Sequence, residues 1–256
     1  MKERVSMYSN TNFVDEILQN KSIKSLIFLV TLGFFSVWLV LNRNTIINSL
    51  PIDTPSEQIS SFAFRVIFTF IILASFSSIF RNQLVILFKI PWKQFKREFI
   101  GASIMMLVAF LILGIIALLI CFLIYRENIY FIVEQLSKQI NSNPGLNSID
   151  PFSILSLSSF AIQLIGEELL FFSIFFLFYM SGKRIAPTGK FVMVFSIFIS
   201  SIIFGLIHLP TYDYNYIQCL FVSISFAIRT SLFITYKNIT ICYLMHLIMD
   251  FLVVLK

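Results

Sequence analysis

Charged side chains are scarce in this chain of 256 residues, where they make up 12% of the sequence against roughly 25% in an ordinary soluble domain. Glycine and proline are also rare, with 8 and 7 residues, and there are only 3 cysteines. So few charges cannot cover the surface of a soluble fold of this size. Intrinsic disorder is excluded as well, because 58% of the residues are hydrophobic. The cysteines show no CxxC pair or metal-type spacing, which argues against a disulfide framework and a thiolate metal site.

Long apolar runs take the place of charge, and they predict an all-α, polytopic transmembrane helix bundle. A helix that crosses a bilayer needs about 20 mostly apolar residues. Seven segments are candidates: Ser25–Leu41, Ile59–Phe80, Phe99–Tyr125, Phe152–Met180, Phe191–Leu209, Tyr216–Tyr236 and Thr240–Leu255. The third and fourth are long enough to be tilted, kinked or broken by an eighth, re-entrant helix. We expect a cytoplasmic tail over residues 1–24 and a single transmembrane domain over residues 25–256.

The distribution of basic residues predicts the orientation of these spans. Of the 19 Lys and Arg residues, 13 fall on the side of the N-terminus and 4 on the other side, while Arg65 and Arg229 lie within spans. Cytoplasmic loops carry the excess of Lys and Arg, so the N-terminus is expected in the cytoplasm. The polar, partly acidic first 24 residues do not resemble a cleaved signal peptide. No basic stripe interleaved with aromatics occurs, so a nucleic-acid partner is not expected.

Two shorter segments are predicted to lie along the membrane surface. Leu84–Ile90 is too short to cross, and Trp92 after it is suited to the headgroup level. The outer segment Arg126–Asp150 has apolar residues at helical spacing between Ile129 and Ile140, which indicates a short amphipathic helix or an ordinary connecting helix.

Ionisable residues inside the predicted spans concentrate in the C-terminal half of the chain. Glu167 and Glu168 lie in the fourth span, His208 in the fifth, and His246 and Asp250 in the seventh. Such groups are costly within a bilayer unless they are paired or face a polar cavity. The two histidines are the only ones in the chain, and three carboxylates accompany them on these spans, which favours a functional site over isolated interhelical hydrogen bonds.

The spacing of these residues suggests which of them act together. His246 and Asp250 are four residues apart and share one helix face. Glu167 and Glu168 are adjacent and point about 100° apart, so one is expected to face the site while the other supports it or pairs with another helix. A Glu and a His around one water can act as general base and acid in hydrolysis, and a second His can stabilise an oxyanion. The same groups could instead bind zinc, although no HExxH is present.

These residues, in this order, resemble the CAAX protease and bacteriocin-processing family, which includes the Ras-converting CAAX endopeptidases and bacterial self-immunity proteins. Its Glu-Glu-x-x-x-Arg motif is matched by Glu167-Glu168, with Phe172 where Arg is usual. Phe-x-x-x-His is matched by Phe204 and His208, and His-x-x-x-Asn/Asp by His246 and Asp250. The resemblance covers about Phe152 to Phe251.

The resemblance implies an intramembrane glutamic endopeptidase without a metal or other cofactor. Glu167 with His208 would activate water, His246 with Asp250 would bind the oxyanion, and Glu168 would hold the geometry. Since Phe172 cannot supply the positive charge of the motif Arg, Arg229 on the next-but-one span is a candidate to supply it. Expected partners are the lipid bilayer, a hydrophobic, lipidated or membrane-associated peptide or protein substrate, and a protein partner in the membrane.

The resemblance further implies a bacterial cell membrane and a role in bacteriocin immunity or peptide-pheromone processing. Three other functions stay open on the sequence: a non-proteolytic scaffold that regulates a partner protein, a zinc-dependent membrane protease, and a proton-coupled transporter. The loss of the motif Arg motivates the first of these, the Glu/His/His set the second, and intramembrane ionisable groups the third.

Overall fold

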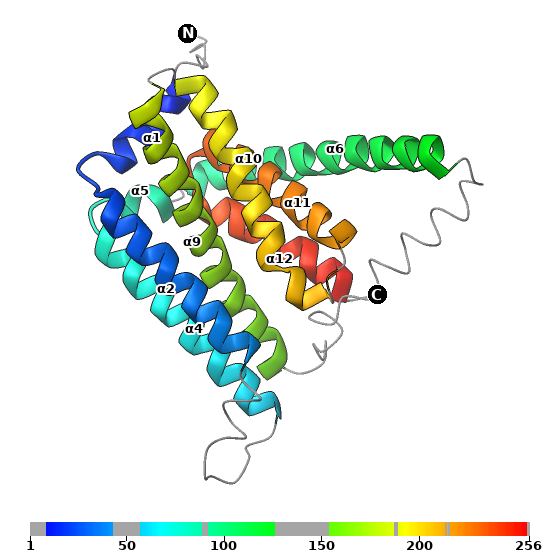
Figure 1. The fold of residues 1–256 in the computed structure, drawn as a ribbon, viewed down its shortest axis with the longest axis horizontal. Coiled ribbons are helices and arrows are strands. Elements are labelled where there is room, and N and C mark those ends of the chain that lie inside the picture. Colours follow the sequence, from blue (N-terminus) through cyan, green and yellow to red (C-terminus); the bar gives the residue numbers. More distant parts are fainter. Residues whose placement is uncertain are drawn as a thin grey trace.

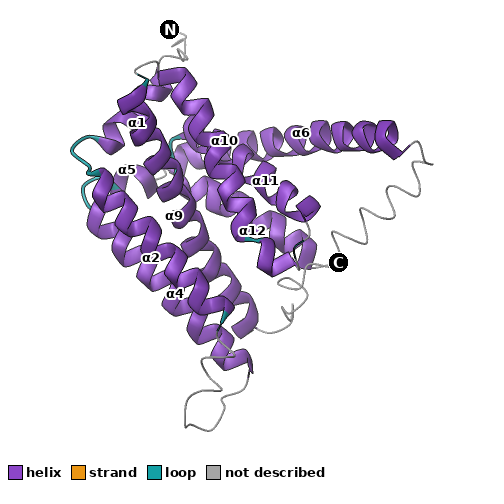
Figure 2. Cartoon of the chain, in the orientation of Figure 1, coloured by secondary structure: helices purple, strands orange, loops and turns teal. Residues whose placement is uncertain are grey.

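The described part of the chain is helical throughout. The computed structural model describes residues 9–42, 57–88, 92–125, 154–186, 189–212, 214 and 216–254. Within these residues there is no strand, as Figure 2 shows. The elements are α1 (Ser9–Leu18), α2 (Ile23–Leu41), α4 (Glu57–Phe80), α5 (Leu84–Phe88), α6 (Trp92–Tyr125), α9 (Ile154–Ile185), α10 (Gly189–Ile207), the 3-10 helix η1 (Leu209–Tyr212), α11 (Tyr216–Tyr236) and α12 (Ile239–Val254). The predicted fold class is therefore confirmed for the described residues.

Helix α9 forms the centre of the bundle. It packs against α2 and α4 on one side and against α10 and α12 on the other (Figure 1). In the apolar stretch of α9 that could cross a membrane, 67% of the residues are buried, against 28% in the corresponding stretches of α2 and α4. The buried face of α9 is rich in phenylalanine, and Phe172 and Phe176 both contact Phe233 of α11. Residues on α9 can therefore meet side chains from several helices at once.

Five described helices are long and apolar enough to cross a membrane, namely those at Ile23–Leu41, Ile59–Phe80, Ile154–Ile185, Gly189–Ile207 and Gln218–Tyr236. They correspond to five of the seven predicted spans. Helix α9 runs unbroken over 32 residues, so the fourth span contains no break of the kind that its length allowed. Within a bilayer a helix satisfies all its own backbone hydrogen bonds, which is why apolar runs free of proline adopt this form.

The other two predicted spans are helical, but their crossing of the membrane stays a prediction. Helix α6 includes Phe99–Tyr125, packs against α11 and α12, and extends away from the bundle in Figure 1. Helix α12 has 16 residues, which at 1.5 Å per residue is about 24 Å and less than a bilayer core of about 30 Å. The count of seven spans, the cytoplasmic N-terminus and the division into a tail and a single transmembrane domain stay predictions.

Helix α10 ends two residues before the predicted end of the fifth span. The helix stops at Ile207, and His208 lies in the turn that follows, ahead of η1. Pro210 cannot continue a helix and disfavours helical backbone in the residue before it. His208 therefore stands at the end of a helix rather than within one.

The predicted polar tail contains a helix that packs on the bundle. Phe13, Val14, Ile17 and Leu18 of α1 are buried and belong to the main hydrophobic core. Asp15 on the same helix accepts hydrogen bonds from Tyr179 and Lys183 near the end of α9, both at 3.1 Å. The predicted interfacial segment forms the short helix α5. The predicted amphipathic helix at residues 129–140 lies outside the described residues.

Two glycines beside the motif residues allow the helices to approach closely. A Cβ on Gly166 would meet the ring of Phe68 and the hydroxyl of Thr69, both on α4. A Cβ on Gly205 would collide with the carbonyl oxygen of Cys219 and the hydroxyl of Ser223 on α11. Helices α9 and α10 therefore pack tightly on α4 and α11 at these two positions.

Replacing Gly205 with alanine should destabilise the protein by about 1–3 kcal/mol, because backbone of α11 must move to admit the new methyl group. Gly101→Ala is the matched control, since a Cβ there meets only the side chain of Tyr236, which can rotate away. Thermal unfolding in detergent should give a clearly lower midpoint for Gly205→Ala than for Gly101→Ala. Equal midpoints would contradict close packing of α10 on α11.

Candidate active site

The predicted site residues come from two helices, α9 and α12, and from the end of α10. Glu167 and Glu168 lie near the middle of α9, and His246 and Asp250 lie one turn apart on α12. Helix α12 packs on both α9 and α11, and α10 packs on both α9 and α11. Ion-pair contacts and electrostatic interactions connect all five predicted residues within this assembly.

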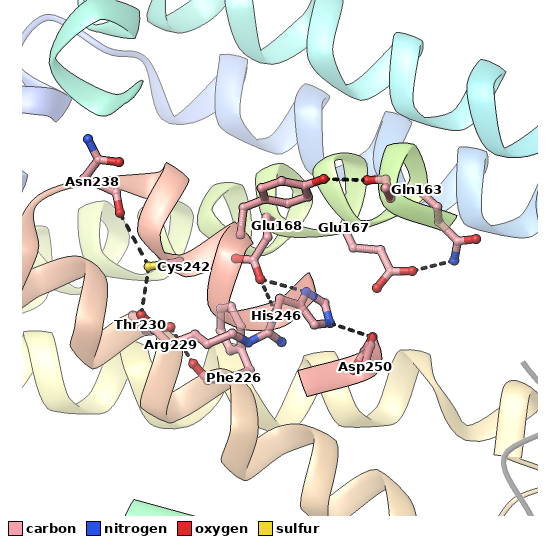
Figure 3. A network of polar contacts seen from close by, with 12 residues as sticks. Gln163, Glu167, Glu168, Phe226, Arg229, Thr230, Asn238, Cys242, His246 and Asp250 are labelled. Carbon is pink, nitrogen blue, oxygen red and sulfur yellow. Dashed lines mark hydrogen bonds and ion pairs between the residues drawn. The ribbon is translucent and has the colours of Figure 1, made fainter. Parts of the chain in front are cut away.

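Glu168 is the centre of the polar network in Figure 3. Its Oε1 atom accepts a charge-assisted hydrogen bond from Nη1 of Arg229, and the two side chains are each only 1% exposed. The same oxygen lies 2.9 Å from Nδ1 of His246, although that approach is not aligned as a hydrogen bond. Oε2 of Glu168 and Nε of Arg229 have no hydrogen-bond partner among the described residues. Each of these two atoms thus keeps a free hydrogen-bonding position in the buried site.

His246 is held between two carboxylates. Its Nδ1 atom faces Glu168, and its Nε2 atom lies 3.4 Å from Oδ2 of Asp250, as the side chains are drawn in Figure 3. The side chain of His246 is 9% exposed and that of Asp250 28%. The predicted pairing on one face of α12 is therefore present, and it sets the plane of the imidazole ring.

Glu167 points away from Glu168 and has a separate partner. Its Oε1 atom accepts a hydrogen bond of 2.6 Å from Nε2 of Gln163, one turn earlier on α9 (Figure 3). Glu167 is half-buried whereas Glu168 is fully buried. Glu168 thus pairs with other helices, as one of the two glutamates was expected to do, while the assignment of Glu167 to the site stays a prediction.

His208 is oriented by its own helix. Its Nδ1 atom lies 3.0 Å from the carbonyl oxygen of Phe204, and its ring packs edge-on against the ring of Phe204. A proton on Nδ1 that is donated to this carbonyl leaves Nε2 as an acceptor. Glu167, His246 and Asp250 lie close enough to His208 for their charges to act on it. No direct hydrogen bond joins His208 to these residues in the described part of the chain.

Arg229 makes the contact with the glutamate pair that the sequence suggested for it. It pairs with Glu168, while Phe172 at the motif Arg position is buried and packs on Phe233 at a ring-centroid distance of 4.6 Å. An arginine one helical turn after Glu168 is thus replaced by an arginine from α11. The ion pair with Glu168 confirms the predicted positive charge of Arg229 beside the glutamate pair.

Several supporting contacts were not foreseen from the sequence. Gln163 was not assigned a role, although a residue four positions before Glu167 shares its helix face. Tyr243 donates from α12 to the carbonyl oxygen of Ala161 on α9 at 3.2 Å, and Sγ of Cys242 lies 3.3 Å from the carbonyl oxygen of Arg229. These contacts fix α12 against α9 and α11, and no sequence spacing reveals contacts between different helices.

Among the described residues, no group of three or more His, Cys, Asp and Glu side chains is arranged to hold a metal ion. The nearest candidates are already engaged, since His246 faces two carboxylates and Glu168 is paired with an arginine. A cation next to Arg229 would also meet a positive charge.

Glu168→Gln should lower the free energy of unfolding by about 3–5 kcal/mol, because it leaves the Arg229 charge buried without its counter-ion. Glu167→Gln is the matched neighbour and should change stability by less than about 1 kcal/mol, since Gln keeps the oxygen that accepts from Gln163. Thermal or denaturant unfolding in detergent measures both. A smaller loss for Glu168→Gln than for Glu167→Gln would contradict the observed burial.

Comparison with known protein families supports the resemblance inferred from the three motifs. Residues 150–252 match the family model described as "Type II CAAX prenyl endopeptidase Rce1-like". The matched segment contains all five predicted site residues together with Arg229. Searches among curated proteins and among solved structures gave no match. Several apolar helices and this match point to an integral membrane protein, and the match of residues 150–252 to the Rce1-like type II CAAX prenyl endopeptidases suggests a membrane protease.

Proposed function

We propose that this protein is an intramembrane glutamic-type endopeptidase that cleaves a hydrophobic, lipidated or membrane-associated peptide or protein. The observation that carries the proposal is the meeting of a half-buried Glu167, a His208 within reach of its charge, and a His246 held by two carboxylates. General base, orienting acid and electrophilic donor are the parts that peptide hydrolysis requires.

In the proposed first step, Glu167 accepts a proton from a water molecule as that water adds to the scissile carbonyl carbon. His208 holds the same water through Nε2, because its Nδ1 is engaged by the Phe204 carbonyl. Gln163 orients the carboxylate of Glu167 by its hydrogen bond.

The tetrahedral intermediate carries a negative oxygen that needs a donor. Nε2 of His246 faces Asp250 at 3.4 Å, a long contact that can be exchanged for a shorter one to the oxyanion. Glu168 keeps the opposite side of the ring in place. The proton held by Glu167 then passes to the amide nitrogen, the C–N bond breaks, and a carboxylic acid and an amine are released.

An apolar groove on the surface of α2 and α10 is consistent with a hydrophobic substrate. It lies between the ends of α2 and α10 and is lined by Phe34, Val37, Trp38, Leu41, Ile203, Leu206, Ile207 and Pro210. Ile207 and Pro210 of this groove are close to His208 in the chain, and we propose that an apolar segment of the substrate binds here. Within this substrate class we propose peptide-pheromone processing or bacteriocin immunity in a bacterial cell membrane, as the three motifs imply.

A non-proteolytic scaffold that regulates a partner protein is the second candidate. Phe172 favours it, since a chain released from catalytic constraint can lose the motif Arg. The Glu168–Arg229 contact weighs against it, because the charge has been kept by another helix at the cost of burying it. Mutational rescue separates the two candidates.

Single alanine variants at Glu167, His208 and His246 should each lower peptide cleavage by at least about 100-fold, the usual contribution of a positioned acid or base. The assay uses the protein in lipid nanodiscs with two apolar reporter peptides, one farnesylated at a C-terminal cysteine and one not, and mass spectrometry of the products. Glu16→Ala is the matched control, since Glu16 is exposed on α1. A chelator should leave cleavage unchanged.

Three results would contradict the proposal. Undiminished cleavage in all three variants at equal protein levels would remove this mechanism. Loss of cleavage with chelator, restored by zinc, would establish metal-dependent hydrolysis in its place. Full rescue of a deletion phenotype by all three variants would favour the scaffold.

A further inference from the structure

Arg229 contacts elements of all three motif segments, although it belongs to none of them. It pairs with Glu168 on α9, and its guanidinium lies 5.9 Å from the ring centroid of Phe204 on α10. Through the shared Oε1 atom of Glu168 it acts on His246 of α12. The carbonyl oxygen of Arg229 also accepts from Cys242 one turn before His246. One side chain of α11 therefore connects the helices that carry the proposed catalytic groups.

The surroundings of Arg229 leave it little freedom. Arg229 is 1% exposed, and it is the largest of the fully buried side chains among the described residues. The rings of Phe204 and Phe226 lie near its guanidinium, each at 5.9 Å, so aromatic faces stabilise the charge on the sides that Glu168 does not cover. A guanidinium is a rigid, planar fork, so its direction fixes where the partner carboxylate must lie.

At residue 172 of α9, where the motif has the arginine that would reach Glu168, this chain has a phenylalanine. Phe172 follows Glu168 by one helical turn, is fully buried, and packs on Phe233. Phe233 itself follows Arg229 by one turn on α11. The aromatic pair and the ion pair are thus stacked one turn apart along the same two helices, and the arginine occupies the α11 side of the ion pair.

We propose that Arg229 is the positioning residue of this site: it fixes the carboxylate of Glu168, and through that carboxylate the ring of His246. This inference rests on the proposed peptidase function for its effect on rate, but its effect on His246 is independent of activity. A cation at this place is what matters, so a cation supplied from α9 at residue 172 should replace it.

The cleavage experiment uses four variants of the full chain. Arg229→Met should lower kcat by about 10- to 100-fold with KM changed by less than about twofold, because a supporting contact is lost while substrate contacts stay. Arg229→Lys should keep part of the rate, since it retains the charge without the fork. Phe172→Arg combined with Arg229→Met should recover most of the loss. Lys237→Met removes a cation from the end of α11, over the ring of Phe13, and should leave the rate unchanged.

The second readout uses the fact that the chain has only two histidines. Protein labelled with 15N-histidine gives two sets of imidazole signals, which His208→Gln assigns. Arg229→Met should shift the ring nitrogen signals of His246, the relocated cation should return them toward their original positions, and Lys237→Met should leave them in place. This measurement needs no substrate, so it tests the inference even where the reporters are not cleaved.

The inference is overturned if Arg229→Met, folded as judged by its elution from a sizing column, keeps the wild-type kcat or leaves the His246 signals in place. It is also overturned if, in folded protein, Arg229→Lys keeps none of the rate lost in Arg229→Met and Phe172→Arg combined with Arg229→Met recovers none of it. A wild-type chain that fails to cleave, with His246 signals that respond to Arg229, would contradict the proposed function and leave the positioning contact standing.

Discussion

The buried ion pair between Glu168 and Arg229 is the contact on which the rest of the site depends. Neither charge can face an apolar interior alone, so α9 and α11 must keep the register in which the two side chains meet. That register also sets Phe172 on Phe233, and His246 of α12 lies against the same carboxylate. The geometry of the proposed catalytic groups therefore follows from the need to neutralise one buried carboxylate.

The helices and the members of the site could be predicted because the membrane restricts what a sequence can do. Apolar runs must be helical there, and ionisable residues are rare enough that Glu167, His208 and His246 stand out. Adjacent glutamates must diverge around a helix, which predicts that Glu167 and Glu168 have different surroundings. The missing motif Arg pointed to Arg229 by simple charge balance.

Other features could not be predicted because they depend on how helices sit against one another. Gln163 and Tyr243 support the site through contacts whose existence requires the depth and rotation of α9 and α12 to be known. The early helix α1 was missed because its charged residues masked four apolar side chains at helical spacing. Helix α10 ends at Ile207 because Pro210 cannot continue a helix. A hydropathy pattern averages over many residues and does not show such a local effect.

A double-mutant cycle between residues 168 and 229 tests the central claim most directly. The free energy of unfolding in detergent would be measured for the wild-type chain, Glu168→Gln, Arg229→Met and the double variant. The account predicts that the two substitutions are strongly non-additive, with a coupling of about 2 kcal/mol or more, because the second removes the charge that the first left unpaired. Additive losses, with a coupling within about 0.5 kcal/mol of zero, would contradict it.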